Sequence, residues 1–204
     1  MGSPPSAVSP HYGTSLPNPP ADDGPEARKG FLNLGWFKTL NGILTIVTII
    51  ALTCVIISAG VSNRHDGYFV NSYAKSQKIK TARVDVDNTR NSVLTFAIIG
   101  LILVLADLII HVFNLIARLP AQTERIFSIV MLVFAAILLI LGCCAAAWEK
   151  KMDDVSKVAK TNQTGFKLKH KGAPAAAAFF LFAAMLSIIG DHVSRLIRRQ
   201  DPPM

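Results

Sequence analysis

Charge, cysteine and catalytic motifs are all scarce in this 204-residue sequence. Only 17% of the residues are charged, against about a quarter in soluble domains, and 51% are hydrophobic. The three cysteines, Cys54, Cys143 and Cys144, lie in apolar stretches, which excludes a disulfide framework or a zinc site in a water-exposed loop. The sequence contains no nucleotide-binding, zinc-protease or nucleophile-elbow motif. We therefore expect no catalytic residue, no metal and no cofactor, and a membrane protein rather than an enzyme.

The N-terminal segment 1–33 differs in composition from the rest of the chain. It holds seven of the eleven prolines and has no apolar periodicity, so we predict a disordered tail. The tail lacks the charged start and apolar region of a cleavable signal peptide, so the first apolar block is expected to direct insertion. Its first six residues fit the N-myristoylation pattern at Gly2; an unmodified tail is the alternative.

Four apolar blocks follow, each close to the roughly 20 residues that a helix needs to cross a bilayer. Backbone groups in hydrocarbon must be hydrogen-bonded within the segment, so each block should be a helix. Trp36 and Trp148 are expected at interface level, and Arg195 where its long side chain reaches water. The sequence predicts an all-α integral membrane protein, an antiparallel four-helix transmembrane bundle over residues 34–199. The expected helices are 36–60, 93–117, 126–148 and 174–197.

The three connections differ in length. Only a short segment containing Pro120 joins the second and third helices, which predicts an antiparallel neighbouring pair. The connections near 61–92 and 149–172 are longer. In the first of them, KIKTARVDVDN alternates apolar and charged residues, which predicts a short strand or hairpin, with an extended loop as the alternative.

The net charge of +8 comes mainly from the long connections. Because the basic residues lie between apolar blocks, we expect anionic lipid headgroups, or an acidic surface outside the cell, rather than nucleic acid as a partner. The positive-inside rule alone would place these connections in the cytoplasm. The basic residues before the first helix, and a glycosylation acceptor pattern at Asn162, favour the opposite arrangement. We expect cytoplasmic termini and a multi-pass protein of the plasma membrane or secretory-pathway vesicles.

Polar residues interrupt the second block. Asp107, His111 and Asn114 have the spacing of one helical face, and Asp107 falls near the middle of the predicted span. A carboxylate there should face the bundle interior, with His111 as its partner. One hypothesis is that this face only forms hydrogen bonds between helices. The other is that it forms a proton or cation path.

Small residues four positions apart recur in the third and fourth blocks, where they would let helices approach closely. Both packing within one bundle and association with a second copy or other membrane proteins explain the pattern. The residues are Gly142, Ala146, Ala173, Ala177, Ala183 and Ser187.

Three segments carry a family resemblance. The first helix reads GWFKTLNGILTIVTIIALTCVI, the second contains ADLIIHVFNLIARLP, and the last reads APAAAAFFLFAAMLSIIGDHVSRLIRR. With the polar tail, four helices and very short central loop, residues 34–199 resemble the MARVEL-domain tetraspan family of MAL, the physins, occludin and fungal relatives.

The resemblance implies a non-enzymatic protein that organises membrane microdomains, vesicle trafficking or membrane apposition. It also implies cytoplasmic termini and association with sterol-rich lipid. The alternative function is a small ion- or proton-conducting channel or transporter that uses the face of Asp107, His111 and Asn114.

Overall fold

The computed structural model describes residues 34–62, 64–113, 115, 121–162 and 172–198. All of them belong to the second of two units into which the chain divides, Met1–Gly30 and Phe31–Met204. The predicted tail and the myristoylation pattern at Gly2 lie outside the described residues.

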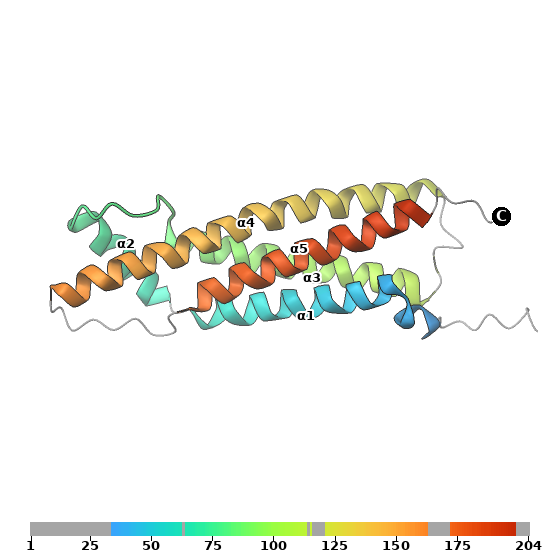
Figure 1. The fold of residues 1–204 in the computed structure, drawn as a ribbon, viewed down its shortest axis with the longest axis horizontal. Helices are drawn as coiled ribbons and strands as arrows, with labels where there is room; N and C mark the ends of the chain where they lie inside the picture. The colour runs from blue at the N-terminus through green and yellow to red at the C-terminus, as the bar shows by residue number, and fades with distance from the viewer. Residues whose placement is uncertain (1–33, 63, 114, 116–120, 163–171, 199–204) are drawn as a thin grey trace, which may run out of the picture. The chain divides into compact units, whose positions relative to one another are not determined.

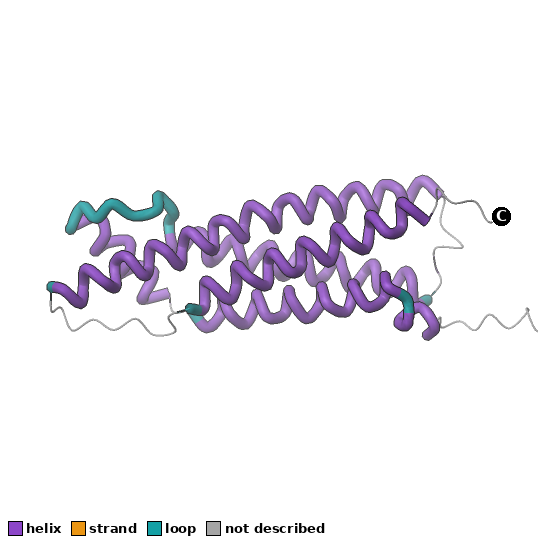
Figure 2. The backbone as a smooth tube through the Cα atoms, in the orientation of Figure 1, coloured by secondary structure: helices purple, strands orange, loops and turns teal. Residues whose placement is uncertain are grey.

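The described residues form helices and no strand (Figure 2). This confirms the predicted all-α fold. The elements are the 3-10 helix η2 (Leu34–Lys38) and the α-helices α1 (Leu40–Val61), α2 (Arg64–Ser76), α3 (Val86–Val112), α4 (Ala121–Thr161) and α5 (Ala173–Arg198).

Four of these helices, α1, α3, α4 and α5, are long and apolar enough to cross a membrane. Each of them carries large aliphatic side chains on its outer surface. Water would oppose so much exposed apolar surface, whereas lipid tails accept it. The protein is therefore an integral, multi-pass membrane protein. Exposed examples, one from each helix, are Ile50, Ile102, Ile140 and Leu186.

Side-chain capping determines where two of the membrane helices begin. The hydroxyl of Thr39 accepts a hydrogen bond from the backbone N–H of Gly42 (3.2 Å) at the start of α1. The carboxylate of Asp85 accepts one from the N–H of Asn88 (2.9 Å) at the start of α3. Such caps satisfy backbone donors that have no partner within the helix.

The four membrane helices run side by side (Figure 1), and their contacts close a ring. Helix α1 packs against α3 and α5, and α4 packs against the same two helices. The middle of the bundle is apolar, with Leu52, Leu138 and Leu181 fully buried. Alternate directions of the four helices place the start of α1 and the end of α5 at one end, which we call the termini end.

Two glycines allow aromatic rings to lie directly on a helix backbone. A Cβ at Gly100 would lie 2.6 Å from the ring of Phe134, and one at Gly142 would lie 2.8 Å from the ring of Phe182. Gly142 is thus a packing residue, as predicted from the small-residue pattern. The close approach gives dispersion contacts that lipid cannot offer.

The other predicted packing residues differ in burial. Ala177 and Ser187 are buried, and Ala173 and Ala183 are partly buried. Ala146 is exposed, so its predicted role in packing within the bundle is wrong. The buried stripe of α4 passes instead through Ala145, because helical periodicity continues from Leu138 and Leu141 through that residue to Trp148.

The connections differ most from the predictions. Helix α4 continues well past Trp148 to Thr161, and its 41 residues extend about 60 Å, roughly twice the hydrocarbon thickness. The strand or hairpin predicted in 61–92 is wrong: this region forms α2, and an extended segment, 77–85, leads into α3. The alternating residues Ile79 and Val84 pack against the side of a small core rather than a partner strand.

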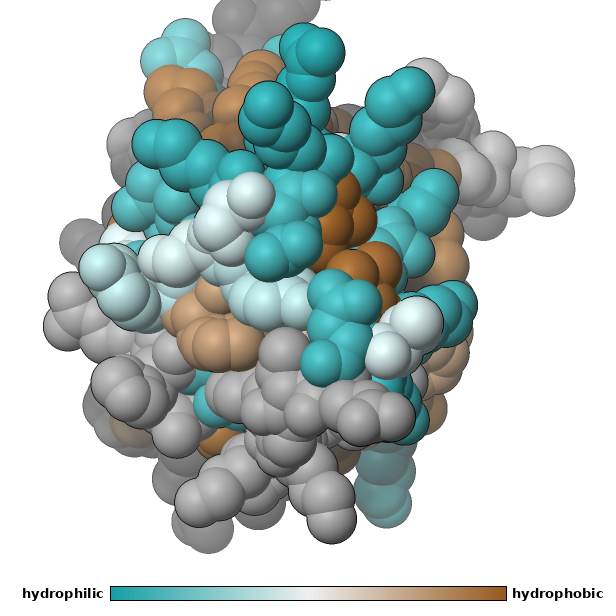
Figure 3. Space-filling view, turned by 90° about the vertical axis from the view of Figure 1, so that its left-hand side faces the viewer, coloured by the Kyte–Doolittle hydropathy of each residue, from teal (hydrophilic) through white to brown (hydrophobic). Residues whose placement is uncertain are grey.

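This second core lies at the other end of the bundle, which we call the connection end. Helix α2 and the first turn of α3 pack against the extension of α4 there. Figure 3 views the molecule from this end and shows mostly hydrophilic side chains, with apolar ones between them. The core consists of Val70, Ala74, Val86, Trp148, Met152 and Val155.

Candidate functional site

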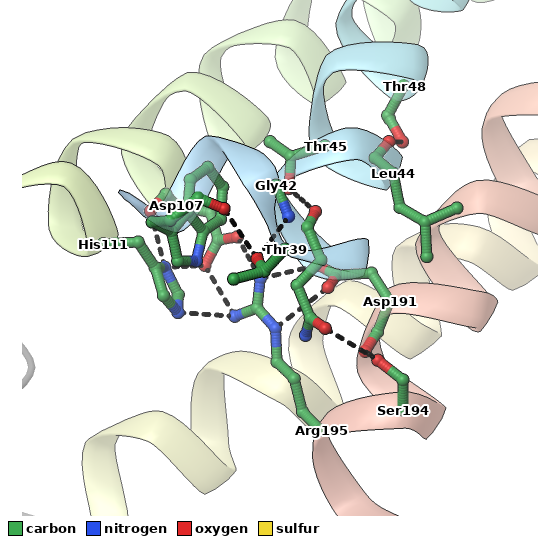
Figure 4. A network of polar contacts seen from close by, with 12 residues as sticks. Thr39, Gly42, Leu44, Thr45, Thr48, Asp107, His111, Asp191, Ser194 and Arg195 are labelled. Carbon is green, nitrogen blue, oxygen red and sulfur yellow. Dashed lines mark hydrogen bonds and ion pairs between the residues drawn. The ribbon is translucent and has the colours of Figure 1, made fainter. Parts of the chain in front are cut away.

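Arg195, in the last turns of α5, is the centre of a buried polar cluster at the termini end (Figure 4). Its Nη1 and Nη2 donate to the two carboxylate oxygens of Asp107 on α3, at 3.2 and 2.8 Å. Its Nε and Nη2 donate to the carboxylate of Asp191, one turn earlier on α5, at 3.1 and 2.6 Å. The guanidinium therefore makes bidentate hydrogen bonds to each of two carboxylates, which is the strongest arrangement for an arginine–carboxylate pair.

His111 completes the cluster on the α3 side. Its Nε2 lies 2.9 Å from Nη1 of Arg195, and its Nδ1 lies 2.8 Å from the carbonyl oxygen of Asp107. Arginine can only donate, so Nε2 must accept, and Nδ1 carries the proton that is donated to the carbonyl. This arrangement fits a neutral imidazole. The ring also stacks on Trp36, with centroids 5.3 Å apart.

Helix α1 is joined to the same region by neutral hydrogen bonds. The hydroxyl of Ser194 shares its one proton between the side-chain oxygen of Asn41, at 3.1 Å, and the carbonyl of Asp191, at 2.8 Å. Asn41 is buried, and its carbonyl accepts the hydroxyl of Thr45 at 3.0 Å. The polar contacts thus connect three of the four membrane helices: α1, α3 and α5.

The cluster lies near the end of the bundle rather than at its middle. Helix α3 ends at Val112, earlier than the predicted residue 117, so Asp107 lies in its second-last turn. Because His111 stacks on Trp36, which is expected at the membrane interface, we expect the cluster at the same level. Asn114, the third residue of the predicted face, lies outside the described residues.

The sequence analysis missed two members of the cluster. It placed Arg195 in reach of water, but its side chain is only 9% exposed because Asp107 and Asp191 neutralise it. An aspartate and an arginine one turn apart in a membrane helix were the available signal. Which helix they face depends on the packing of the whole bundle, which periodicity within one helix does not reveal.

The cluster holds two carboxylates and one guanidinium, so with a neutral His111 it has an excess of one negative charge. Throughout the described ranges, no group of three or more His, Cys, Asp or Glu residues is arranged to hold a metal ion. The three cysteines form no disulfide. The cluster can bind protons and hold helices together, but it offers no nucleophile paired with a base.

The predicted glycosylation acceptor lies at the connection end. Asn162 is exposed just after the last turn of α4, and its side-chain nitrogen donates to the hydroxyl of Tyr73 at 3.1 Å. The two residues that complete the acceptor pattern lie outside the described residues. Glycosylation of Asn162 stays a prediction.

Comparison of the chain with protein families, curated proteins and solved structures finds no match. The likeness to MARVEL proteins therefore rests on the three sequence segments and the four-helix layout.

Proposed function

We propose that this protein is a non-enzymatic tetraspan that organises the membrane around it, in microdomain formation, vesicle trafficking or membrane apposition. Its partners would be sterol-rich or anionic lipids, further copies of itself or other membrane proteins. The proposed location is the plasma membrane or secretory-pathway vesicles, with cytoplasmic termini. The resemblance to MARVEL proteins supports this proposal, together with the large apolar surface that the four helices turn outward.

The observation that carries the proposal is the separation of polar and apolar layers inside the bundle. The polar cluster is confined to one end, where Arg195 forms direct ion pairs with Asp107 and Asp191. The layers beyond it contain Leu52, Leu138 and Leu181, all fully buried. Conduction needs polar groups along the whole membrane depth, whereas the side chains of this buried core are apolar.

The second candidate is a proton- or ion-conducting channel or transporter that uses the face of Asp107, His111 and Asn114. The excess carboxylate of the cluster favours it, because such a group can take up and release a proton. The two functions differ in what Asp107 does. In the first it holds helices together, and in the second it carries the transported ion.

Flux in reconstituted vesicles tests the two candidates directly. With a pH-sensitive dye inside, we expect the wild-type protein to dissipate an imposed proton gradient no faster than protein-free vesicles. Asp107→Asn should lower thermal stability and leave that rate unchanged. Asp154→Asn, the same change on the extension of α4, is the matched control. A wild-type flux that Asp107→Asn abolishes and Asp154→Asn retains would establish the second candidate instead.

Lipid sorting tests the proposed role itself. In giant vesicles with coexisting sterol-rich and sterol-poor phases, we expect the labelled protein to concentrate in the sterol-rich phase or at its boundary. Uniform distribution, or confinement to the sterol-poor phase, would contradict the proposal.

A further inference from the structure

A cleft of about 710 Å³ opens at the connection end, outside the polar cluster already described. Its walls come from α2, the extended segment 77–85 and Lys151 of α4, just beyond Trp148. The volume is in the range of sites that bind small ligands, about 300–1,000 Å³. Figure 3 shows the mostly hydrophilic surface of this end of the molecule.

Lys151 forms the buried part of the cleft wall and is only 8% exposed. Its ammonium donates to the side-chain oxygen of Asn71 and to the carbonyl of Val84, both at 2.7 Å. These bonds use two of its three N–H donors. Both acceptors are neutral, so they fix the position of the ammonium without neutralising its charge.

Three further cationic side chains line the same cleft: Lys75 from α2, and Lys80 and Arg83 from the extended segment. Among the residues that line it, Asp85 is the one acid. Its carboxylate is already bonded to the N–H of Asn88 as the cap of α3. The concave surface therefore carries a clear excess of positive charge, which attracts anions and raises their local concentration.

We infer that this cleft is a binding site for a phosphate-type oxyanion. Arg83 offers the planar fork that suits phosphate oxygens, and the lysines offer point charges around it. Lys151 follows Trp148 by three residues, about 5 Å along the helix, so the cleft begins close to the predicted headgroup level. The phosphate could thus belong to a lipid headgroup or to a soluble phosphorylated molecule.

The inference deepens the proposed function, because it gives the chemistry of one partner, and two measurements separate the sources. In the first, inorganic pyrophosphate is titrated into the full-length protein in neutral detergent, at constant ionic strength, by calorimetry. In the second, the protein is placed in phosphatidylcholine nanodiscs with or without phosphatidic acid, and native mass spectrometry counts retained phosphatidic acid. Saturable binding in the first measurement indicates a soluble ligand, and retention only in the second indicates a lipid.

Charge removal inside and outside the cleft shows whether the site is specific. Lys80→Gln with Arg83→Gln should weaken binding at least tenfold, because two direct contacts are lost. Lys157→Gln with Lys160→Gln removes the same charge from the same end, outside the cleft lining, and should change binding less than twofold. An equal loss in both double variants would show diffuse attraction and overturn the inference.

Asp85→Asn provides a test that a folding defect cannot imitate. Asparagine caps a helix about as well as aspartate, so α3 should still begin at the same place. Removing the one negative charge of the cleft should tighten binding severalfold. Unchanged or weaker binding, or no saturable binding of either probe to the wild-type protein, would overturn the inference. Because these measurements detect neither proton flux nor lipid-phase sorting, their failure is distinct from failure of the proposed function.

Discussion

The two ends of the bundle are held together by different interactions. At the termini end, Arg195 pairs with two carboxylates, and neutral hydrogen bonds connect α1 to the same region. At the connection end, an apolar core around Trp148 holds α2 against α4, and the buried Lys151 has only neutral hydrogen-bond acceptors in the contacts described above. The buried cation is thus ion-paired within the protein at one end, whereas positive charge is left available to a ligand at the other.

This difference suggests a division of roles. A buried ion-pair cluster is costly to break, since removing one member leaves the others buried without compensation. It therefore suits the part of the bundle that must stay closed. A buried cation whose hydrogen-bond acceptors are neutral, beside an open cleft, suits the part that meets other molecules. Substitutions at each end can test this contrast.

Arg195→Met should have the largest effect on stability. It leaves Asp107 and Asp191 buried together without a cation, and losing one partner of a buried ion pair costs about 3–5 kcal/mol. Reversible unfolding in mixed detergent micelles, followed by circular dichroism, measures the loss. Arg83→Met removes the same charge from an exposed position and should change the unfolding midpoint little.

A triple variant identifies the cause of that loss. Adding Asp107→Asn and Asp191→Asn to Arg195→Met removes the uncompensated carboxylates and should restore a large part of the stability. If the triple variant were as unstable as Arg195→Met alone, the loss would come from packing, and the contrast between the two ends would fail.

Lys151→Met should have a smaller effect. It leaves the carbonyl of Val84 without the ammonium donor, a cost of about 1–3 kcal/mol, but it strands no buried charge. The side-chain oxygen of Asn71 keeps its hydrogen bond from the backbone N–H of Val86 (3.3 Å). Lys150→Met, the same change at the adjacent exposed position, is the control in the same unfolding assay. A loss as large as that of Arg195→Met would mean that Lys151 is part of a charge network like the one at the termini end.

Ser194→Ala should have the smallest effect. Hydrogen bonds between membrane helices contribute about 0.6 kcal/mol on average, and this change removes the one from Ser194 to Asn41. Thr53→Ala, whose hydroxyl bonds only to the carbonyl of Ile49 in its own helix, should be closer to neutral. If both variants were as stable as the wild type, the ion pairs alone would stabilise the termini end.

The two ends of the bundle are expected to lie on opposite sides of the membrane, and thiol labelling tests this without any measurement of stability. In a cysteine-free background, Lys160→Cys should react with an impermeant thiol reagent on right-side-out vesicles, since Lys160 is exposed and the proposed topology places the connection end outside. Ser6→Cys should react only after the vesicles are opened. The reverse pattern would place the basic cleft in the cytoplasm and contradict the proposed orientation.

Much of the membrane bundle was predictable because long apolar blocks allow few alternatives to helices. The burial of Asp107 and His111 was also predictable, because a carboxylate in a membrane helix must avoid lipid. The pairing of Asp107 and His111 with Arg195 was not predictable, since which residues of α3 and α5 face each other depends on how the four helices pack together. The bounds of the second predicted span, 93–117, were wrong as well, since α3 runs over Val86–Val112, so the depth of Asp107 was misplaced.

The connection end was harder to predict because its signals are short and mixed with polar residues. The extension of α4 nevertheless carries a helical stripe, Trp148, Met152, Val155 and Ala159, which is buried in the structure and visible in the sequence. The alternation at 78–86 was misleading, since its apolar side chains pack on α2 and α4. Which residues surround Lys151 depends on that packing and could not be deduced from spacing.

The position of Arg195 also has a consequence for how the protein is made. Chains emerge from the ribosome in order, and Arg195 lies in the last membrane helix, so α3 is synthesised long before its cation exists. During that interval Asp107 and His111 enter the membrane without their partner. The nascent bundle is therefore expected to stay open until α5 arrives, so the pairing of Arg195 with Asp107 is a late step of assembly, after α1, α3 and α4 have been made.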